Sequence, residues 1–105
     1  MATINQLLSV IPYGKGNAIH AEDIARQLQL PTGGNQVEAR GLIRDAIKNG
    51  HIVLSTPTSG YWRSNDKQEV QNYIQSLNER AQEISDRSAA IKRAWNNANP
   101  QNLIP

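Results

Sequence analysis

The sequence predicts a mainly α-helical protein with one small β-hairpin and a long C-terminal helix. Three observations predict this fold class. Apolar residues recur at helical spacing in three short segments that precede Gly50. Two β-rich runs joined by a proline-containing turn follow between His51 and Ser64. From Asn65 to Ala98 there is neither Gly nor Pro, and apolar residues alternate in steps of four and three.

The composition limits the classes of protein to consider. The chain has 105 residues, of which 38% are hydrophobic and none is Phe, so a modest core with an exposed extension is expected. The absence of cysteine excludes disulfides and thiolate metal sites. The start, MATINQLLSV, lacks the basic segment of a signal peptide, and no apolar run is long enough to cross a membrane. We therefore expect a cytoplasmic protein. The net charge of +2 permits a nucleic-acid partner without requiring one.

The first two predicted helices are short. Thr3 and Gln6 have the spacing of a capping box at the start of the first helix, which ends before the glycine-rich loop PYGKGN. The apolar pair Ala18-Ile19 precedes the second helix, which Pro31 is expected to close. His20 stands where a Ser or Thr cap is expected, which weakens the start of this helix.

The third predicted helix runs from about Gln36 to Asn49. Asn35 is its expected N-cap, and Gly50 is placed to adopt the left-handed conformation after its last turn. Its inward-facing apolar positions are expected to be Val37, Ala39, Leu42, Ile43, Ala46 and Ile47.

The hairpin is predicted from HIVLS and YWRS, joined by a loop of roughly five residues, TPTSG. Tyr61 and Trp62 are neighbours on a strand, so their side chains face opposite sides. One is expected in the core. The other either packs on the long helix or offers a stacking surface for a base.

Three helices, a hairpin and a further helix follow the order of a winged helix-turn-helix, in which the hairpin is the wing. The segments NAIHAEDIARQLQL, VEARGLIRDAIKNG and GYWRS occur in this order, and a long helix follows. This ordered set resembles small winged-helix proteins encoded by phages and prophages, over about Ile11 to Ala98. The resemblance implies DNA binding. As our hypothesis for the function, we expect a phage-type transcription or replication accessory factor. The turn LPTGGN is longer than is usual between the paired helices.

The third helix carries the predicted DNA contacts. Gln36, Arg40, Arg44 and Lys48 recur at every fourth position, which makes a stripe about 120° wide on the helix surface. Arg can read guanine, Gln can read adenine, and Lys can neutralise phosphate. Because the N-terminal end of such a helix usually reaches the bases, we assign Gln36 and Arg40 to bases, with Asn35 as a further candidate. Arg44 and Lys48 are assigned to the DNA backbone. The alternative is a solvated helix face.

The tip of the hairpin adds a second set of predicted DNA contacts. Thr58 and Ser59 supply hydroxyls and amides there, and Arg63 follows on the returning strand. Such groups commonly bind phosphate, although a plain polar turn explains the same residues. Lys15, in the loop PYGKGN, is a weaker candidate.

The long helix predicts a homodimer. Its apolar residues keep a 3.5-residue repeat for about four heptads, and Tyr73 with the start of this stripe is expected to pack on the winged domain. A second copy, parallel or antiparallel, is expected to cover the rest, and the alternative is a helix that bends back over its own domain. The expected dimerisation residues are Leu77, Ala81, Ile84, Ser88, Ile91 and Trp95. The predicted organisation is therefore a winged domain (1–64), a dimerisation helix (65–98) and a flexible tail (99–105).

No catalytic or metal site is predicted. His20 and His51 lack a second ligand at a suitable spacing, and no catalytic triad, phosphate loop or converging carboxylate pair is evident. We therefore expect neither an enzyme nor a cofactor. Two hypotheses remain: a dimeric protein that binds double-stranded DNA, and a winged-helix module that binds another protein.

Overall fold

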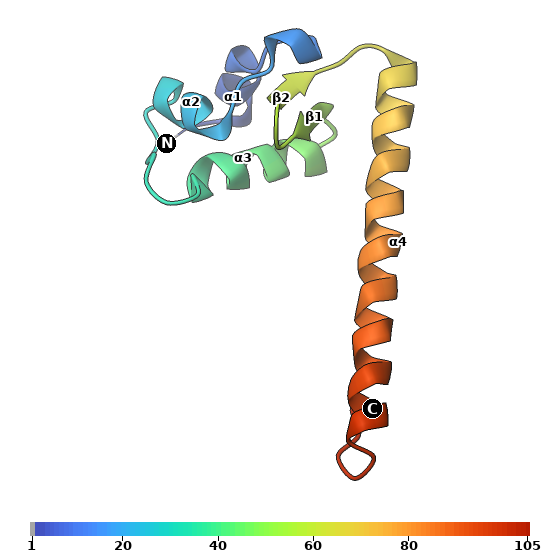
Figure 1. Cartoon of the computed structure of the whole chain (residues 1–105). Coiled ribbons are helices and arrows are strands. Elements are labelled where there is room, and N and C mark those ends of the chain that lie inside the picture. Colours follow the sequence, from blue (N-terminus) through green and yellow to red (C-terminus); the bar gives the residue numbers. More distant parts are fainter. Residues whose placement is uncertain (1) are drawn as a thin grey trace. The chain divides into compact units, whose positions relative to one another are not determined.

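The computed structural model describes residues 2–105, which fall into two units, 2–70 and 71–105. The elements are α1 (Ile4–Val10), the 3-10 turn η1 (Lys15–Asn17), α2 (Ala21–Gln27), α3 (Val37–Lys48), β1 (Val53–Thr56), β2 (Gly60–Arg63) and α4 (Lys67–Ala98) (Figure 1). The predicted fold class is confirmed: the protein is mainly α, with three short helices and a hairpin in a winged helix-turn-helix arrangement, followed by one long helix.

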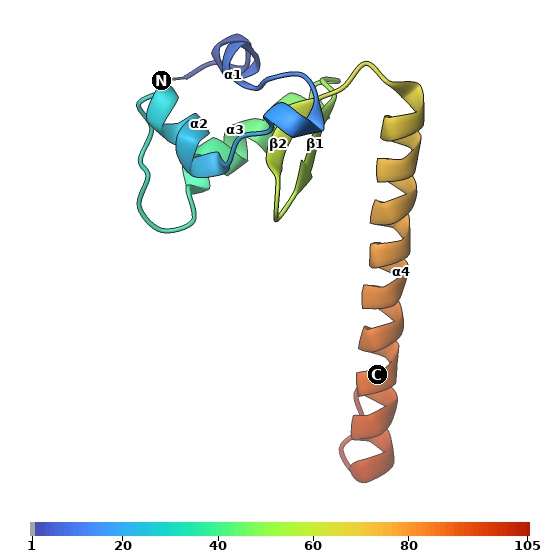
Figure 2. The same ribbon diagram turned by 45° about the horizontal axis from the view of Figure 1, so that its top comes forward.

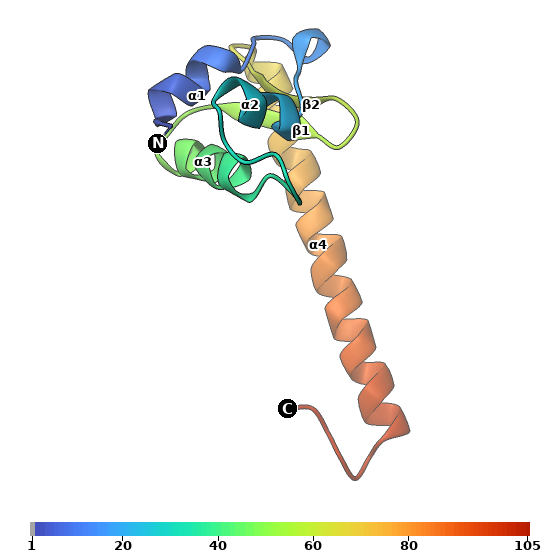
Figure 3. The same ribbon diagram turned by 90° about the vertical axis from the view of Figure 1, so that its left-hand side faces the viewer.

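The three short helices and the hairpin share one small core. Figure 3 shows α1, α2 and α3 gathered beside the hairpin. The most deeply buried large side chains are Leu7 of α1, Ile24 of α2 and Leu54 of β1. Each contributes about 1.5–3 kcal/mol when it leaves water. Small residues, Ala25, Ala39 and Ala46, are also fully buried and let the helices approach closely.

The ends of α1 and α2 follow from local sequence. The predicted capping box is confirmed: the Gln6 amide N–H donates to Thr3 Oγ1 at 3.1 Å, and the Thr3 amide N–H donates to Gln6 Oε1 at 2.9 Å. His20 is the N-cap of α2 and makes no side-chain capping bond, as expected. However, α2 ends at Gln27 and not at Pro31, because Gln29 takes a left-handed conformation (φ 57°) and reverses the chain.

The loop after α1 and the helix α3 differ from the prediction at three points. The loop PYGKGN, between α1 and α2, contains the turn η1. The N-cap of α3 is Gln36, in a left-handed conformation (φ 51°), so the prediction that Asn35 caps the helix is wrong. Val37 and Ile47, expected inside, are 72% and 48% exposed. The inward face of α3 is narrower than predicted because the small core covers only Ala39, Ile43 and Ala46 fully.

The wing is an antiparallel pair of short strands (Figure 2). Thr56 pairs with Gly60, so three residues connect the strands and not the predicted five. The loop is shorter because Gly60, at φ +95°, already belongs to the ladder, and the Ser59 amide N–H donates to Thr56 Oγ1 within the turn. Ile19 exchanges two backbone hydrogen bonds with Tyr61, of 3.0 and 2.6 Å. The apolar pair Ala18-Ile19 thus joins the edge of the hairpin through a single antiparallel bridge, at Ile19.

The helix α4 begins two residues later than predicted, since Asp66 caps it. The Asp66 carboxylate accepts the amide N–H of Gln68 at 2.9 Å, and the Ser64 hydroxyl accepts the Asp66 N–H at 3.1 Å. None of the 32 residues of α4 is buried. Between residues 2 and 105, no helix combines the length and apolar character needed to span a membrane.

The C-terminal segment folds back on the end of α4. The Trp95 indole N–H donates to the carbonyl of Asn102 at 2.8 Å. The side-chain amide of Asn96 pairs with the backbone of Ile104 in both directions, at 2.8 and 3.1 Å. The tail expected to be loose is thus hydrogen-bonded to the helix, and we call this arrangement, residues 95–104, the C-terminal hook.

Candidate nucleic-acid interface

The outward face of α3 holds two cations without partners. Arg44 and Lys48 are exposed, and in the part of the chain that the structure describes neither makes an ion pair or hydrogen bond. Val37 and Gly41 share their side of the helix, because these four positions lie within about 60° of one another around its axis. We call Val37, Gly41, Arg44 and Lys48 the outer row of α3.

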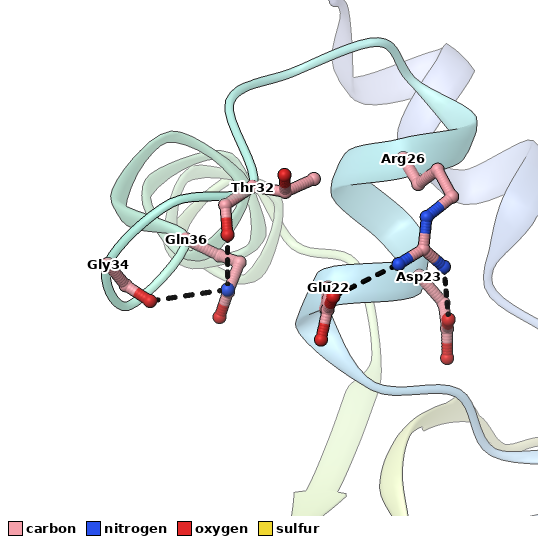
Figure 4. Close-up of polar contacts among 6 residues, drawn as sticks. All are labelled: Glu22, Asp23, Arg26, Thr32, Gly34 and Gln36. Atoms are coloured by element: carbon pink, nitrogen blue, oxygen red, sulfur yellow. Dashed lines mark hydrogen bonds and ion pairs between the residues drawn. The ribbon is translucent and has the colours of Figure 1, made fainter.

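Gln36 is held in the turn before α3. Its side-chain amide nitrogen donates to the carbonyl of Thr32 at 2.9 Å and to that of Gly34 at 3.3 Å (Figure 4). These bonds stabilise the left-handed entry into the helix. The predicted base-reading amide is therefore occupied by the protein backbone. Asn35 is exposed beside it, and its carbonyl oxygen accepts a bond from Arg40.

Arg40 connects the start of α3 to the wing. Its Nε donates to the carbonyl of Asn35 at 2.7 Å, and its Nη1 donates to the Tyr61 hydroxyl at 3.1 Å. Arg40 lies on the flank of α3 that faces the hairpin, next to the outer row. The structure thus places Arg40 and Arg44, predicted as one stripe, in different environments: Arg40 orients two elements, and Arg44 faces solvent.

The positions of the two aromatic residues of β2 agree with the prediction only in part. Trp62 is in the core at 3% exposure, and its indole N–H donates to the Glu69 carboxylate at 3.1 Å. Tyr61 is half-buried against the core and bonded to Arg40. In place of the predicted packing on the long helix, the Tyr61 hydroxyl accepts a bond from α3, and the use of its ring as a stacking surface for a base stays a prediction. Sequence spacing offered no signal for a contact between residues so far apart in the chain.

The predicted wing residues lie in two places, at the tip of the hairpin and at the opposite end of β2. Thr58 is exposed at the tip and Ser59 is half-buried beside it. Arg63 lies at the other end of β2, where its guanidinium stacks over the Tyr13 ring at 4.6 Å. Its Nη1 also lies 3.5 Å from the carbonyl of Leu8. Arg63 therefore joins β2 to the chain that follows α1. Lys15, the weaker candidate, has its Nζ 5.8 Å from the centre of the Trp62 ring.

Other charges near α3 are paired or acidic. On α2, Arg26 forms ion pairs with Glu22 at 3.0 Å and Asp23 at 3.1 Å (Figure 4). Glu38 and Asp45 are exposed on the flank of α3 opposite to Arg40. The positive charge of this helix thus lies on the outer row, at Arg44 and Lys48, and on Arg40 beside it, whose hydrogen-bond partners are neutral.

The apolar stripe of α4 is uncovered. Ile84 and Ile91 are 55% and 64% exposed, and Leu77, Trp95, Ala81 and Ser88 are exposed as well. These residues are the predicted dimerisation set, and they lie along one side of the helix with a 3.5-residue repeat. Such a continuous apolar stripe is unusual for a helix that works alone in water.

Neither a protein-family model, a curated protein nor a solved structure matches this chain. Across residues 2–105 there is no cluster of three His, Asp or Glu side chains arranged to bind a metal ion.

Proposed function

We propose that this chain is a DNA-binding protein that inserts α3 into the major groove and acts as a homodimer. In keeping with the sequence resemblance, we assign it to the phage-type transcription or replication accessory factors. The observation that carries the proposal is the outer row of α3. On the third helix of a winged arrangement, Arg44 and Lys48 are exposed and have no partner among residues 2–105, and this is the helix that enters the groove in such folds.

The roles of the side chains follow from their surroundings. Arg44 and Lys48 neutralise phosphates or reach base edges, because no protein group competes for their donors. Thr58 and Ser59 at the wing tip offer additional phosphate contacts. Arg40 positions α3 against the wing through Tyr61, and Arg63 and Gln36 support the scaffold.

A titration with fluorescent duplex DNA of random sequence tests the proposal. Fluorescence anisotropy at several salt concentrations gives the slope of log affinity against log salt. Replacing Arg44 and Lys48 together by Gln should weaken binding and make the slope less negative by about two units, since each phosphate contact contributes about 0.9. Arg40→Ala is unsuitable as the first variant because it also removes the bond to Tyr61.

A matched control separates a local interface from overall charge. The double variant Lys92→Gln/Arg93→Gln removes the same charge from α4. It should leave the slope closer to that of the parent than the α3 variant does. Equal effects of the two variants would show attraction by net charge alone. A parent protein that binds no duplex at low salt would refute the proposal.

A second candidate function is a winged-helix module that binds another protein. The observation that favours it is apolar exposure on the winged unit, where Ile47 is 48% and Ile52 is 51% exposed. Failure of the parent to bind DNA, together with saturable binding of a purified protein that Ile47→Asp/Ile52→Asp abolishes, would favour this function.

A further inference from the structure

Val37 is an apolar residue that the small core does not use. It is the first residue of α3 and, at 72% exposure, the most exposed large apolar side chain in residues 2–105. A β-branched residue loses side-chain freedom in a helix and gains nothing in return where it is not packed. Gly34 and Gln36 take left-handed conformations in the turn that leads into α3, and Val37 follows this turn with its side chain exposed.

The neighbours of Val37 are those of an interface. It begins the outer row, and Gly41, Arg44 and Lys48 follow it along the same side of α3. Next to Val37, Gly41 has no side chain, and a Cβ built there would meet only the Arg44 guanidinium, at 3.7 Å. Along the outer row, a small rigid apolar side chain (Val37) comes first. A position without a side chain (Gly41), where another surface can approach closely, follows it, and the two cations come last.

We propose that Val37 is a specificity-determining residue that contacts the C5-methyl group of a thymine in the major groove. This inference rests on the proposed function. The thymine methyl is the apolar group that bases expose in that groove, and residues at the N-terminal end of a recognition helix reach base edges. Val37 stands at that end, while the cations lie further along the row, toward phosphates. The stiff, branched side chain matches a methyl contact and offers no hydrogen bond that would select another base.

The test removes one methyl group from the DNA. A preferred duplex is first selected from a random library with the parent protein. Each thymine of that duplex is then replaced in turn by uracil, which lacks only the C5-methyl group. We expect one replacement to weaken binding of the parent by about fourfold, the effect of one buried methyl-sized group. The same replacement should leave binding of Val37→Ala unchanged, because the contact is already lost.

Two further variants make the assignment specific. Ile47→Ala removes another exposed apolar side chain of α3 on the side of the hairpin, and it should retain the full uracil effect. Val37→Thr keeps the branched shape with one methyl group and should show a reduced effect. Since Val37 is exposed and Ala favours helices, loss of folding does not confuse the result, and thermal unfolding of the free protein checks this point.

Each outcome decides the inference. A uracil effect that disappears in Val37→Ala, is reduced in Val37→Thr and persists in Ile47→Ala supports it. A uracil effect of equal size in the parent and Val37→Ala assigns the methyl to another residue and overturns it, as does the absence of any uracil effect. If the parent binds no duplex at all, the proposed function fails and this inference fails with it, which the anisotropy titration reveals before any thymine is replaced.

Discussion

Gly60 of the hairpin lies against the backbone of Ile19, and this close approach requires glycine at position 60. Its φ is +95°, and an added Cβ would overlap the carbonyl of Ile19. Gly60→Ala should therefore lower the free energy of unfolding by about 2 kcal/mol or more, combining left-handed strain with the loss of this close approach. Chemical denaturation measures the change. Gly33→Ala is the control, because no atom lies within 4 Å of a Cβ there. Equal stability of the two variants would contradict the Ile19 bridge.

Gly41 gives the opposite prediction for stability. It lies inside α3, and a Cβ would make only an ordinary contact with Arg44. Gly41→Ala should stabilise the protein by up to about 1 kcal/mol through helix propensity, and it should weaken DNA binding if the groove approaches the outer row. Thermal unfolding and anisotropy measure the two effects separately. A stabilised variant with unchanged affinity would place the DNA away from Gly41.

Single residues also show what the sequence can and cannot predict. The capping box of Thr3 and Gln6 was predictable because its two bonds are local. The exposure of Arg44 followed from helical periodicity. The engagement of Arg40 was not predictable, since Tyr61 lies 21 residues away and the contact depends on how the hairpin folds against α3. The N-cap of α3 was predicted at Asn35 and not at Gln36, because a left-handed conformation at a residue other than glycine has no clear sequence signal.

At the scale of elements, the number, type and order of helices and strands were predictable from periodicity. Boundaries shifted where a side chain took a capping role, as Asp66 does before α4. The width of a buried face was not predictable, because it depends on how much core the neighbouring elements provide. Val37 and Ile47 are apolar, as inward-facing residues are. That the core does not reach them is seen only in the folded structure.

The C-terminal hook is an element that periodicity did not reveal, and it leads to a prediction. Asn96→Ala removes both bonds to Ile104, so residues 102–104 should detach from α4. Nuclear magnetic resonance should show faster exchange of the Ile104 amide and a changed Trp95 indole N–H signal. The neighbouring variant Asn97→Ala is the control and should change neither. Unaltered signals in Asn96→Ala would mean that the hook does not depend on this side chain.

At the scale of the whole molecule, the uncovered stripe of α4 predicts self-association. The helix is about 50 Å long, and its exposed Ile and Leu side chains each contribute about 1.5–3 kcal/mol if a second copy buries them. Ala81 and Ser88 bury little, so the dimer should dissociate on dilution. A dimer also offers two α3 helices, which favours inverted-repeat DNA sites whose half-sites lie about one helical turn apart, or a multiple of it.

Sedimentation velocity over a range of concentrations tests this prediction. The parent should change from monomer to dimer as the concentration rises, whereas Ile84→Asp/Ile91→Asp should stay monomeric, because paired helices would have to bury its charges. Gln82→Asp/Ala89→Asp places two carboxylates with the same spacing on the opposite side of α4 and should still dimerise. If both variants dimerise like the parent, the contact lies elsewhere. A parent that stays monomeric at high micromolar concentration would exclude the dimer, and the expectation of inverted-repeat sites would fall with it.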